Sequence, residues 1–293
     1  MCCGHCMTAI LTQRVKANGL EFEVAVCGDG PRFALMMHGF PECGFSWRHQ
    51  MPMLANKGYT VWAPDLRGYG GSDRPGRVRD YRMRNLVDDV TGLIDAAGAK
   101  ETLLVGHDWG GAIAWIFALA GIRPLERLIV MNLPHPRLFR RGLRSWKQLR
   151  RSWYIFFFQL PWLPEALYQM QNWRLACRTL VKSSRPGTFS LDDLNAYRKA
   201  WSQPEAYTCM VNWYRAIIQR PPSPLKNPRI SIPTLLIWGA KDRFLGREMA
   251  QPSIDFCDKG RLVFFEEATH WVQHEEADKV NRLLIEFLNE KSK

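Results

Sequence analysis

The first third of the chain alternates short hydrophobic runs with turns that are rich in Gly, Pro and Asp. Continuous hydrophobic runs of this length are typical of strands that are buried on both faces. We expect such strands over Phe33–Phe40, Thr60–Asp65 and Thr102–Asp108. Between them, residues 46–58 and 85–98 carry hydrophobic side chains at helical spacing and end at glycine, a common helix terminus. The order strand, helix, strand, helix predicts a mostly parallel sheet flanked by helices.

The same pattern returns near the C-terminus. Three further runs predict strands and a final amphipathic run predicts a helix: 127–134, 233–242, 261–270 and 277–290. The segment between residues 134 and 233 predicts several helices and no convincing pair of strands. We therefore expect an α/β core of residues 1–134 and 230–293, interrupted by a helical cap (lid) domain of residues 135–229. An insertion that follows a strand of an open α/β sheet lies over the crevice where such sheets bind ligands.

Composition narrows the class of protein. With 293 residues, 46% of them hydrophobic, the chain suits one large folded domain or a core with one insertion. It contains neither the pattern of a signal peptide nor the ~20 uninterrupted apolar residues of a membrane span. Eight scattered cysteines show no disulfide-like spacing, which favours a reducing, cytoplasmic location. The N-terminal CCGHC lacks a second half-site for metal, so we expect surface thiols and no metal there.

The net charge of +12 comes from 40 Lys and Arg residues against 28 Asp and Glu residues. Much of the excess lies in residues 137–151, where Arg and Lys are interleaved with Leu, Phe and Trp. A solvated cap helix is one interpretation of this stretch. A peripheral membrane contact is the other, because basic amphipathic segments bind anionic lipid surfaces. No recognition motif accompanies the charge, so a nucleic-acid partner is not expected.

The sequence VGHDWGG at residues 105–111 predicts a sharp turn from strand to helix that exposes one side chain, Asp108. Asp is also a favoured N-cap residue, so a simple helix cap is an alternative. The glycines around it favour a nucleophile. An ionised carboxylate needs no base to attack. Its attack on an ordinary ester would give an unfavourable anhydride, whereas attack on an epoxide or an alkyl halide gives a stable ester.

The hydrolysis of such an ester requires a base. His270, after the last predicted strand, would activate the attacking water, and Asp242 would orient the imidazole and stabilise its charged form. Nucleophile, acid and histidine then follow one another in the chain order of α/β-hydrolase triads. The candidates all lie where predicted strands end, so we expect them to meet at one edge of the sheet.

An oxyanion forms when water attacks the ester, and backbone amides should face it. The segment HGFP at residues 38–41 predicts one donor at Phe40, and the residue after the nucleophile, Trp109, predicts the second. A cis peptide bond before Pro41 is compatible with this turn. His107 and His274 are weaker candidates, which we expect behind the site or on the surface.

These segments together resemble the epoxide hydrolases of the α/β-hydrolase fold, over about residues 16–287. The matching segments are HGFPECGFSWRHQ, PDLRGYGGSD, GHDWGGAIAW, NLPHP, WGAKDRF and ATHWVQHE. The resemblance implies the α/β-hydrolase fold, a lipophilic epoxide as substrate and no cofactor. It also implies that two cap tyrosines, here Tyr154 and Tyr214, hold the epoxide oxygen and donate a proton. A phenol with a pKa near ~10 is protonated at neutral pH and suits that role.

Several points remain open within this prediction. We expect the substrate to contact five residues: His38, Pro41, Trp109, Phe157 and Trp271. A haloalkane dehalogenase with the same triad is the main alternative, because HDWGG also occurs in that family. Fluoroacetate dehalogenases carry arginine after the nucleophile, so Trp109 argues against that activity. A third hypothesis is a non-catalytic binding protein on the same scaffold, but the intact triad argues against it. We expect a monomer or a homodimer.

Overall fold

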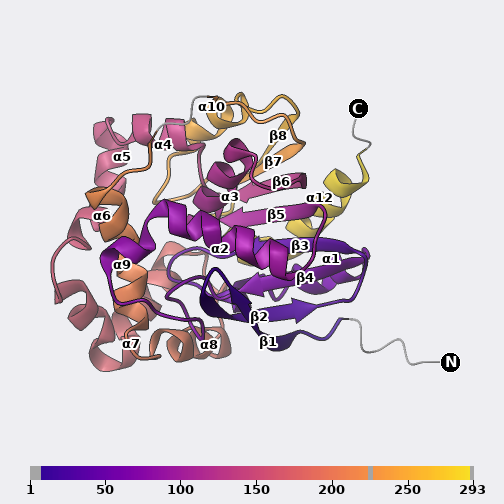
Figure 1. The fold of residues 1–293 in the computed structure, drawn as a ribbon. Helices are drawn as coiled ribbons and strands as arrows, with labels where there is room; N and C mark the ends of the chain where they lie inside the picture. Colours follow the sequence, from indigo (N-terminus) through magenta and orange to yellow (C-terminus); the bar gives the residue numbers. More distant parts are fainter. Residues whose placement is uncertain (1–7, 224–226, 291–293) are drawn as a thin grey trace.

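An eight-stranded sheet forms the centre of the molecule (Figure 1), with strand order β1-β2-β4-β3-β5-β6-β7-β8. The computed structural model describes residues 8–223 and 227–290, so the N-terminal CCGHC lies outside the described residues. The strands are β1 (Leu11–Ala17), β2 (Leu20–Cys27), β3 (Arg32–Met37), β4 (Tyr59–Pro64), β5 (Thr102–His107), β6 (Leu125–Met131), β7 (Thr234–Gly239) and β8 (Gly260–Phe265). The pairs from β4 through β8 are parallel, which confirms the predicted α/β fold class.

The antiparallel hairpin of β1 and β2 was not among the predicted elements. Its turn is formed by Asn18 and Gly19, both with positive φ (47° and 73°). An Asn-Gly pair between alternating hydrophobic and polar residues is a strong hairpin signal in a sequence. The hairpin extends the sheet beyond β4, on the side remote from β8.

Helices cover both faces of the sheet. They are α1 (Met51–Ala55), α2 (Met83–Ala96), α3 (Trp109–Ala120), α10 (Ala250–Ile254), α11 (Val272–Glu275) and α12 (Ala277–Asn289). Three short 3₁₀ turns join them: Gly44–Trp47, Val78–Tyr81 and Arg247–Met249. The helix predicted over 46–58 is therefore shorter than expected, while the terminal helix is confirmed. Neighbouring residues of one strand, such as Leu103 and Leu104, belong to different hydrophobic clusters, as expected when both faces are buried.

A helical segment, residues 136–219, lies between β6 and β7. It contains α4 (Pro136–Gly142), α5 (Trp146–Arg151), α6 (Trp153–Phe157), α7 (Leu163–Ser183), α8 (Leu191–Trp201) and α9 (Ala206–Gln219). Figure 1 shows these helices gathered on the side of the molecule away from the N-terminus. Helix α7 is interrupted at residues 170–173, where the backbone leaves the helical conformation. The structure thus has helices, and among its described residues no strand, where the sequence predicted a helical insertion.

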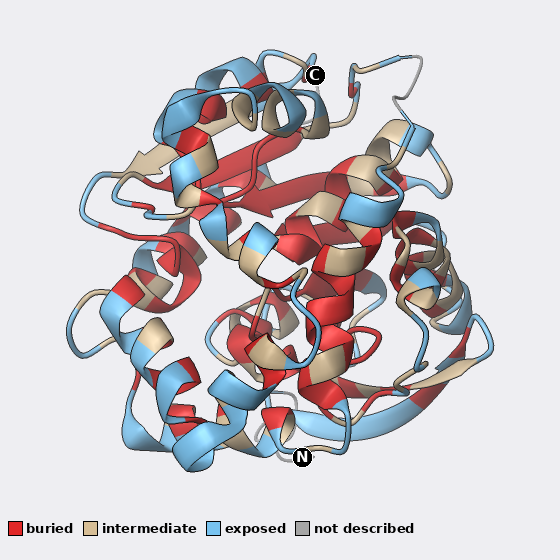
Figure 2. Cartoon of the chain, turned by 90° about the vertical axis from the view of Figure 1, so that its left-hand side faces the viewer, coloured by how far each residue is buried: buried red, intermediate tan, exposed pale blue. Residues whose placement is uncertain are grey.

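Burial follows this arrangement. Figure 2, which faces the helical segment, shows buried residues concentrated in the centre and exposed ones along the outer helices. Within the described parts of the chain, no helix is both long and apolar enough to cross a membrane. In those same parts, no group of three or more His, Cys, Asp or Glu side chains is arranged to hold a metal ion.

Candidate active site

Asp108 lies in the sharp turn between β5 and α3. Its backbone adopts φ 49° and ψ −119°, and its side chain makes no capping hydrogen bond to the helix. The helix-cap interpretation is therefore wrong. A Cβ at Gly110 would overlap the carbonyls of Met37 and His38, so glycine allows α3 to begin directly against the end of β3. The turn holds the carboxylate above the end of the sheet, as the sequence predicted.

The loop after β3 crosses directly over this carboxylate. The backbone amide of Phe40 donates a hydrogen bond to Asp108 Oδ1 at 3.0 Å, and the Phe40–Pro41 peptide bond is cis. A Cβ at Gly39 would overlap the Asp108 side chain, so the approach requires glycine. The predicted donor Phe40 is thus in contact with the predicted nucleophile.

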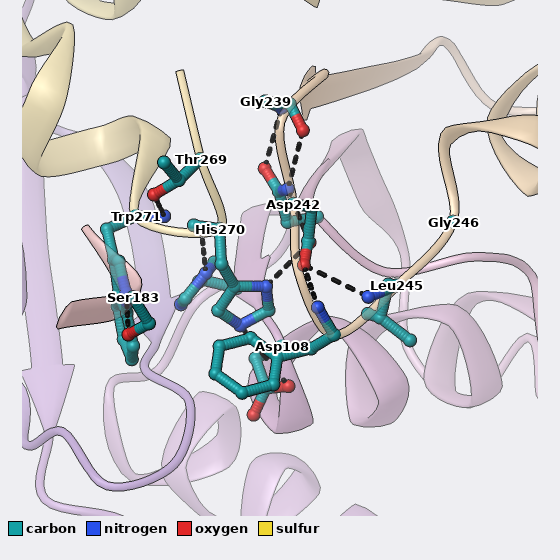
Figure 3. A network of polar contacts seen from close by, with 12 residues as sticks. Asp108, Ser183, Gly239, Asp242, Leu245, Gly246, Thr269, His270 and Trp271 are labelled. Carbon is teal, nitrogen blue, oxygen red and sulfur yellow. Dashed lines mark hydrogen bonds and ion pairs between the residues drawn. The ribbon is translucent and has the colours of Figure 1, made fainter. Parts of the chain in front are cut away.

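His270 lies between two carboxylates (Figure 3). Its Nδ1 is 2.7 Å from Asp242 Oδ2, and its Nε2 is 3.6 Å from Asp108 Oδ2. The structure therefore brings together three residues that are far apart in the sequence. The loops after β5, β7 and β8 carry them, because the carboxyl ends of neighbouring parallel strands meet at one edge of the sheet.

Asp242 is held by a full set of donors. Its Oδ1 accepts hydrogen bonds from the amides of Phe244 and Leu245, at 2.7 and 3.0 Å. Its Oδ2 accepts one from Asn132 Nδ2 at 2.8 Å, besides the contact with His270. Asn132 has a positive φ of 46°, and its Oδ1 accepts from the amide of Gly239. The sequence predicted no role for Asn132, which appears there only within NLPHP, because its partners Gly239 and Asp242 are 107 and 110 positions away.

The electrostatics favour an ion pair between Asp108 and His270. Burial disfavours a charged imidazole, but the charge of Asp242 and the hydrogen bonds to both carboxylates outweigh it and raise the pKa of His270 to about 10. Burial alone would raise the pKa of Asp108, yet the contacts with His270 lower it below its ordinary value. The Asp108 side chain is 13% exposed and that of His270 is 3% exposed, so the carboxylate is the more accessible of the two.

Behind the triad lies a buried polar network centred on Glu42. One oxygen of its carboxylate is 2.8 Å from His107 Nδ1, and the other is 2.6 Å from His274 Nε2. Burial would raise the pKa of Glu42, but the charge and hydrogen bonds of His107 and His274 hold it well below its ordinary value. Of the two locations that the sequence left open for these histidines, behind the site and on the surface, the structure shows the first: both are buried.

His107 connects this network to the triad. Its Nε2 is 2.9 Å from the backbone carbonyl of His270, while its Nδ1 faces Glu42. Both ring nitrogens are therefore engaged, so the His107 ring is fixed between the Glu42 carboxylate and the backbone of His270. Beyond them, Arg48 Nη1 lies 3.2 Å from His274 Nδ1, and the Arg48 guanidinium pairs with Asp193 of α8 at 2.8 Å.

A cavity of about 380 Å³ opens in front of Asp108 and His270. Apart from these two residues its walls are mostly aromatic and aliphatic: Phe40, Pro41, Trp153, Tyr154, Phe157, Phe158, Leu167, Tyr168, Leu175, Ala176, Thr179, Leu180, Tyr214, Phe244 and Trp271. Most of the lining comes from α6, α7 and α9. The helical segment and the sheet edge therefore enclose the cavity between them.

Tyr154 and Tyr214 both line this cavity, with their ring centroids 5.8 Å apart. They come from α6 and α9, about 60 positions apart in the chain by their residue numbers. Burial raises the pKa of both hydroxyls well above the ordinary value, and the negative charge of Asp108 raises it further. Both phenols are therefore protonated at neutral pH, as a hydrogen-bond donor must be.

Only some of the predicted substrate contacts line the cavity. Pro41, Phe157 and Trp271 line the cavity, and the Trp271 indole donates to Ser183 Oγ at 2.9 Å (Figure 3). Trp109 is not among the lining residues; its ring packs edge-on against Tyr214, with centroids 5.1 Å apart.

His38 does not line the cavity either, and this corrects its predicted role as a substrate contact. Its Nε2 accepts a hydrogen bond from the Leu66 amide at 3.0 Å, so its Nδ1 carries the proton and donates to the Gly39 carbonyl at 2.9 Å. Both ring nitrogens thus form hydrogen bonds with the backbone. The physical role of His38 is to fix the loop that carries Phe40.

Known proteins resemble this chain over almost its whole length. A sequence model of the α/β hydrolase fold matches residues 35–277. The AB hydrolase superfamily protein YfhM of Bacillus subtilis is 41% identical, over 96% of this chain and 99% of that protein. Human epoxide hydrolase 4 is 38% identical, over 96% of this chain and 79% of that protein. The crystal structure of a Bacillus megaterium epoxide hydrolase in complex with an inhibitor superposes with a TM-score of 0.87 at 30% identity, covering 95% of this chain and all of that one.

Proposed function

The chain belongs to the epoxide hydrolases of the α/β-hydrolase fold family, and from this premise we propose that it converts lipophilic epoxides and water to vicinal diols through an ester of Asp108. One observation carries the proposal. A carboxylate that is ionised and a pair of protonated phenols face the same mostly apolar cavity. This combination suits an electrophile that is attacked at carbon while its oxygen gains a proton.

In the first step, Asp108 attacks one ring carbon of the epoxide. A carbon–oxygen bond forms to the carboxylate, the ring carbon–oxygen bond breaks, and its electron pair passes to the epoxide oxygen. Tyr154 and Tyr214 bind that oxygen, and one of them supplies its proton. No metal or redox partner is required for this displacement.

The second step depends on a change in His270. While Asp108 is ionised, two carboxylates keep the imidazole protonated, with a pKa of about 10. Formation of the ester removes one of these charges, so the pKa of His270 falls and the imidazole gives up its proton. The proton that His270 releases is returned through solvent to the phenol that protonated the epoxide oxygen, so both phenols are neutral again and the site gains or loses no net proton. Esterification itself produces the base that the next step requires.

Neutral His270 then takes a proton from water, and the oxygen of that water attacks the carbonyl carbon of the ester. The Phe40 amide, which already donates to Asp108 Oδ1, stabilises the oxyanion, and the Trp109 amide is the proposed second donor. When the tetrahedral intermediate collapses, the bond from the carbonyl carbon to the alkyl oxygen breaks, that oxygen takes the remaining proton of the attacking water, and the diol leaves with the former Asp108 oxygen. The carboxylate is regenerated with an oxygen from water.

We also propose that residues 135–229 act as a cap on a core formed by residues 1–134 and 230–293. The contribution of α6, α7 and α9 to the cavity walls supports this division, because most of the contacts available to a substrate come from them. In this arrangement the core provides the charged groups of the site and the cap provides the two phenols.

Single-turnover hydrolysis in ¹⁸O-water tests the mechanism. With enzyme in excess over a styrene-type epoxide, the first diol should carry no label, and label should appear in Asp108 by mass spectrometry. Label in the first diol would mean direct attack by water. Halide release from bromoalkanes, without turnover of any epoxide, would instead indicate the haloalkane dehalogenase that shares this triad. A panel of aryl, terminal alkyl and fatty-acid epoxides identifies the substrate class.

A further inference from the structure

Large hydrophobic side chains are exposed on the outside of α5, α6 and α7. Of the thirteen exposed large hydrophobic residues in the described chain, nine belong to this stretch: Trp146, Trp153, Phe156, Leu160, Trp162, Leu167, Met170, Leu175 and Val181. Trp146 and Trp162 are 72% and 71% exposed, which is unusual for tryptophan. We call these nine residues, with the basic residues of α5 and α7, the α5–α7 surface. Exposed apolar side chains gathered in one region indicate a contact with another body.

The same stretch is strongly basic, as is the α4 segment directly before it. Residues 137–182 contain ten Lys or Arg residues and a single acidic one, Glu165, and so supply a formal +9 of the net +12. Glu165 is buried and paired with Arg215 at 2.6 Å, so it offers no negative charge at the surface. Among the described residues, Lys147 is the only one of the ten that forms an ion pair, with Glu248 at 3.5 Å. The other nine cationic groups form no ion pair with a described acidic residue, so their charge is not compensated at this surface.

Helix α7 shows how the two properties are combined. After the interruption at residues 170–173, Arg174, Arg178 and Lys182 follow one another at intervals of four and so share one side of the helix. All three are exposed, as are Leu175 and Val181 beside them. On this side of α7, cations lie next to aliphatic groups and no anion is present. Segments that lie in the interface of an anionic bilayer have this pattern.

The α5–α7 surface also contains the mouth of the cavity. Trp153, Leu167 and Leu175 are exposed on the outside and line the cavity on the inside. A solute that reaches Asp108 by this route therefore passes between apolar side chains. Helices α5 to α7 lie on the side of the molecule shown face-on in Figure 2, away from the sheet.

We propose that the α5–α7 surface docks onto an anionic lipid bilayer, with the mouth of the cavity turned toward the lipid. Tryptophan and long basic side chains are the residues that anchor proteins at the level of the lipid headgroups. The uncompensated positive charge selects an anionic leaflet over a second copy of the chain, since two such surfaces repel one another. The passage of a lipophilic epoxide from the bilayer into the cavity rests on the proposed function; the docking itself does not.

Co-sedimentation with vesicles tests the docking. The full chain is mixed with vesicles of phosphatidylcholine alone or with phosphatidylglycerol added, and no epoxide is present. We expect binding only to the anionic vesicles, and its loss in 0.5 M salt. Replacement of the basic row on α7 (R174E, R178E and K182E together) should weaken binding about 100-fold or more. Replacement of Trp146 and Trp162 by Ala should weaken it about tenfold or more, because the apolar contact is lost.

A matched control separates a local surface from net charge. K16E, K57E and K100E change the charge by the same amount at three exposed positions outside the α5–α7 surface, and this variant should bind as the wild type does. Equal loss in both triple variants, or wild-type protein that stays in solution with every vesicle, would overturn the proposal. The proposal would also be overturned if light scattering showed that the wild type is a dimer and that the two tryptophan replacements convert it to a monomer. Turnover of a water-soluble epoxide, measured on the same proteins, reports separately on the chemistry.

Discussion

The two walls of the cavity differ in how their polar groups are satisfied. On the sheet side, His270 contacts both Asp108 and Asp242, and the two carboxylates accept backbone hydrogen bonds at 2.7 to 3.0 Å. On the helical side, Tyr154 and Tyr214 lie among aromatic rings, with centroids 5.0 to 6.0 Å apart. The sheet side is a charged network fixed by the backbone, whereas the helical side is an apolar wall with two hydroxyls.

This difference matches two requirements of epoxide hydrolysis. Nucleophilic attack and ester hydrolysis require charges at fixed distances, which the loops of a rigid sheet provide. Binding an apolar molecule and holding its single oxygen requires surface and only a few donors. Changes on the two sides should therefore alter different steps, and four experiments test that expectation.

The largest effect is expected on the sheet side. Asp108→Ala removes the nucleophile, so kcat should fall by about 10⁴-fold or more. No covalent adduct should be detected by mass spectrometry after mixing with an epoxide. Retention of ordinary turnover would show that Asp108 does not react with the substrate. Far-ultraviolet circular dichroism of the variant controls for folding.

On the helical side, replacement of both Tyr154 and Tyr214 by Phe should slow ring opening by about 10² to 10³-fold. Hydrolysis of the ester should be unaffected, since in the proposed mechanism the two hydroxyls act on the epoxide oxygen alone. Stopped-flow kinetics separate the two rates. Phe157→Leu is a matched control, because it changes the same wall without removing a hydroxyl. A slower second step in the double variant would contradict the separation of tasks.

A smaller effect is expected from the network behind the triad. Glu42→Gln removes the charge that holds His107, and through it the backbone of His270, so ester hydrolysis should slow by about tenfold. Ring opening should change less, and the pH dependence of the second step should shift. Tyr197→Phe is the control, since its hydroxyl lies 3.4 Å from Glu42 Oε1 and contributes little. An equal effect on both steps would mean a general loss of structure.

The smallest effect concerns stability. In the folded protein the pKa of His270 is about 10, and in the unfolded chain it is about 6.5, so the folded state binds more protons between these values. The stabilisation is complete below about pH 6.5 and is lost as the pH rises toward 10. Urea denaturation at pH 7, 8.5 and 10 should show this decline. Asp108→Asn removes one carboxylate, so its decline should be less steep; equal slopes would contradict the ion pair.

The sequence predicted those parts of the site that depend on local pattern. Asp108, Asp242 and His270 each follow a hydrophobic run that reads as a buried strand, and parallel strands bring such positions to one edge. The phenols of Tyr154 and Tyr214 could be named only through the resemblance to a family. Nothing in the spacing of the intervening helices predicts that α6 and α9 meet over the same carboxylate.

The sequence did not predict contacts between distant residues that no pattern connects. Glu42 pairs with His107 and His274, which are 65 and 232 positions away. His38 was interpreted as a substrate contact because HGFP borders the site, yet its ring nitrogens are both bound to backbone. The hairpin of β1 and β2 was a different kind of omission, since the Asn18-Gly19 signal was present in the sequence.

The close crossings at Gly39 and Gly110 bear on how such an enzyme can diversify. A side chain at either position would displace the nucleophile or the start of α3, whichever epoxide is bound. Leu167, Leu175 and Phe157 line the cavity without taking part in either crossing, so they can change in size without that penalty. A mutant library aimed at new substrates should therefore randomise the helical wall and keep both glycines. Its active members should differ in substrate preference while sharing one chemical mechanism.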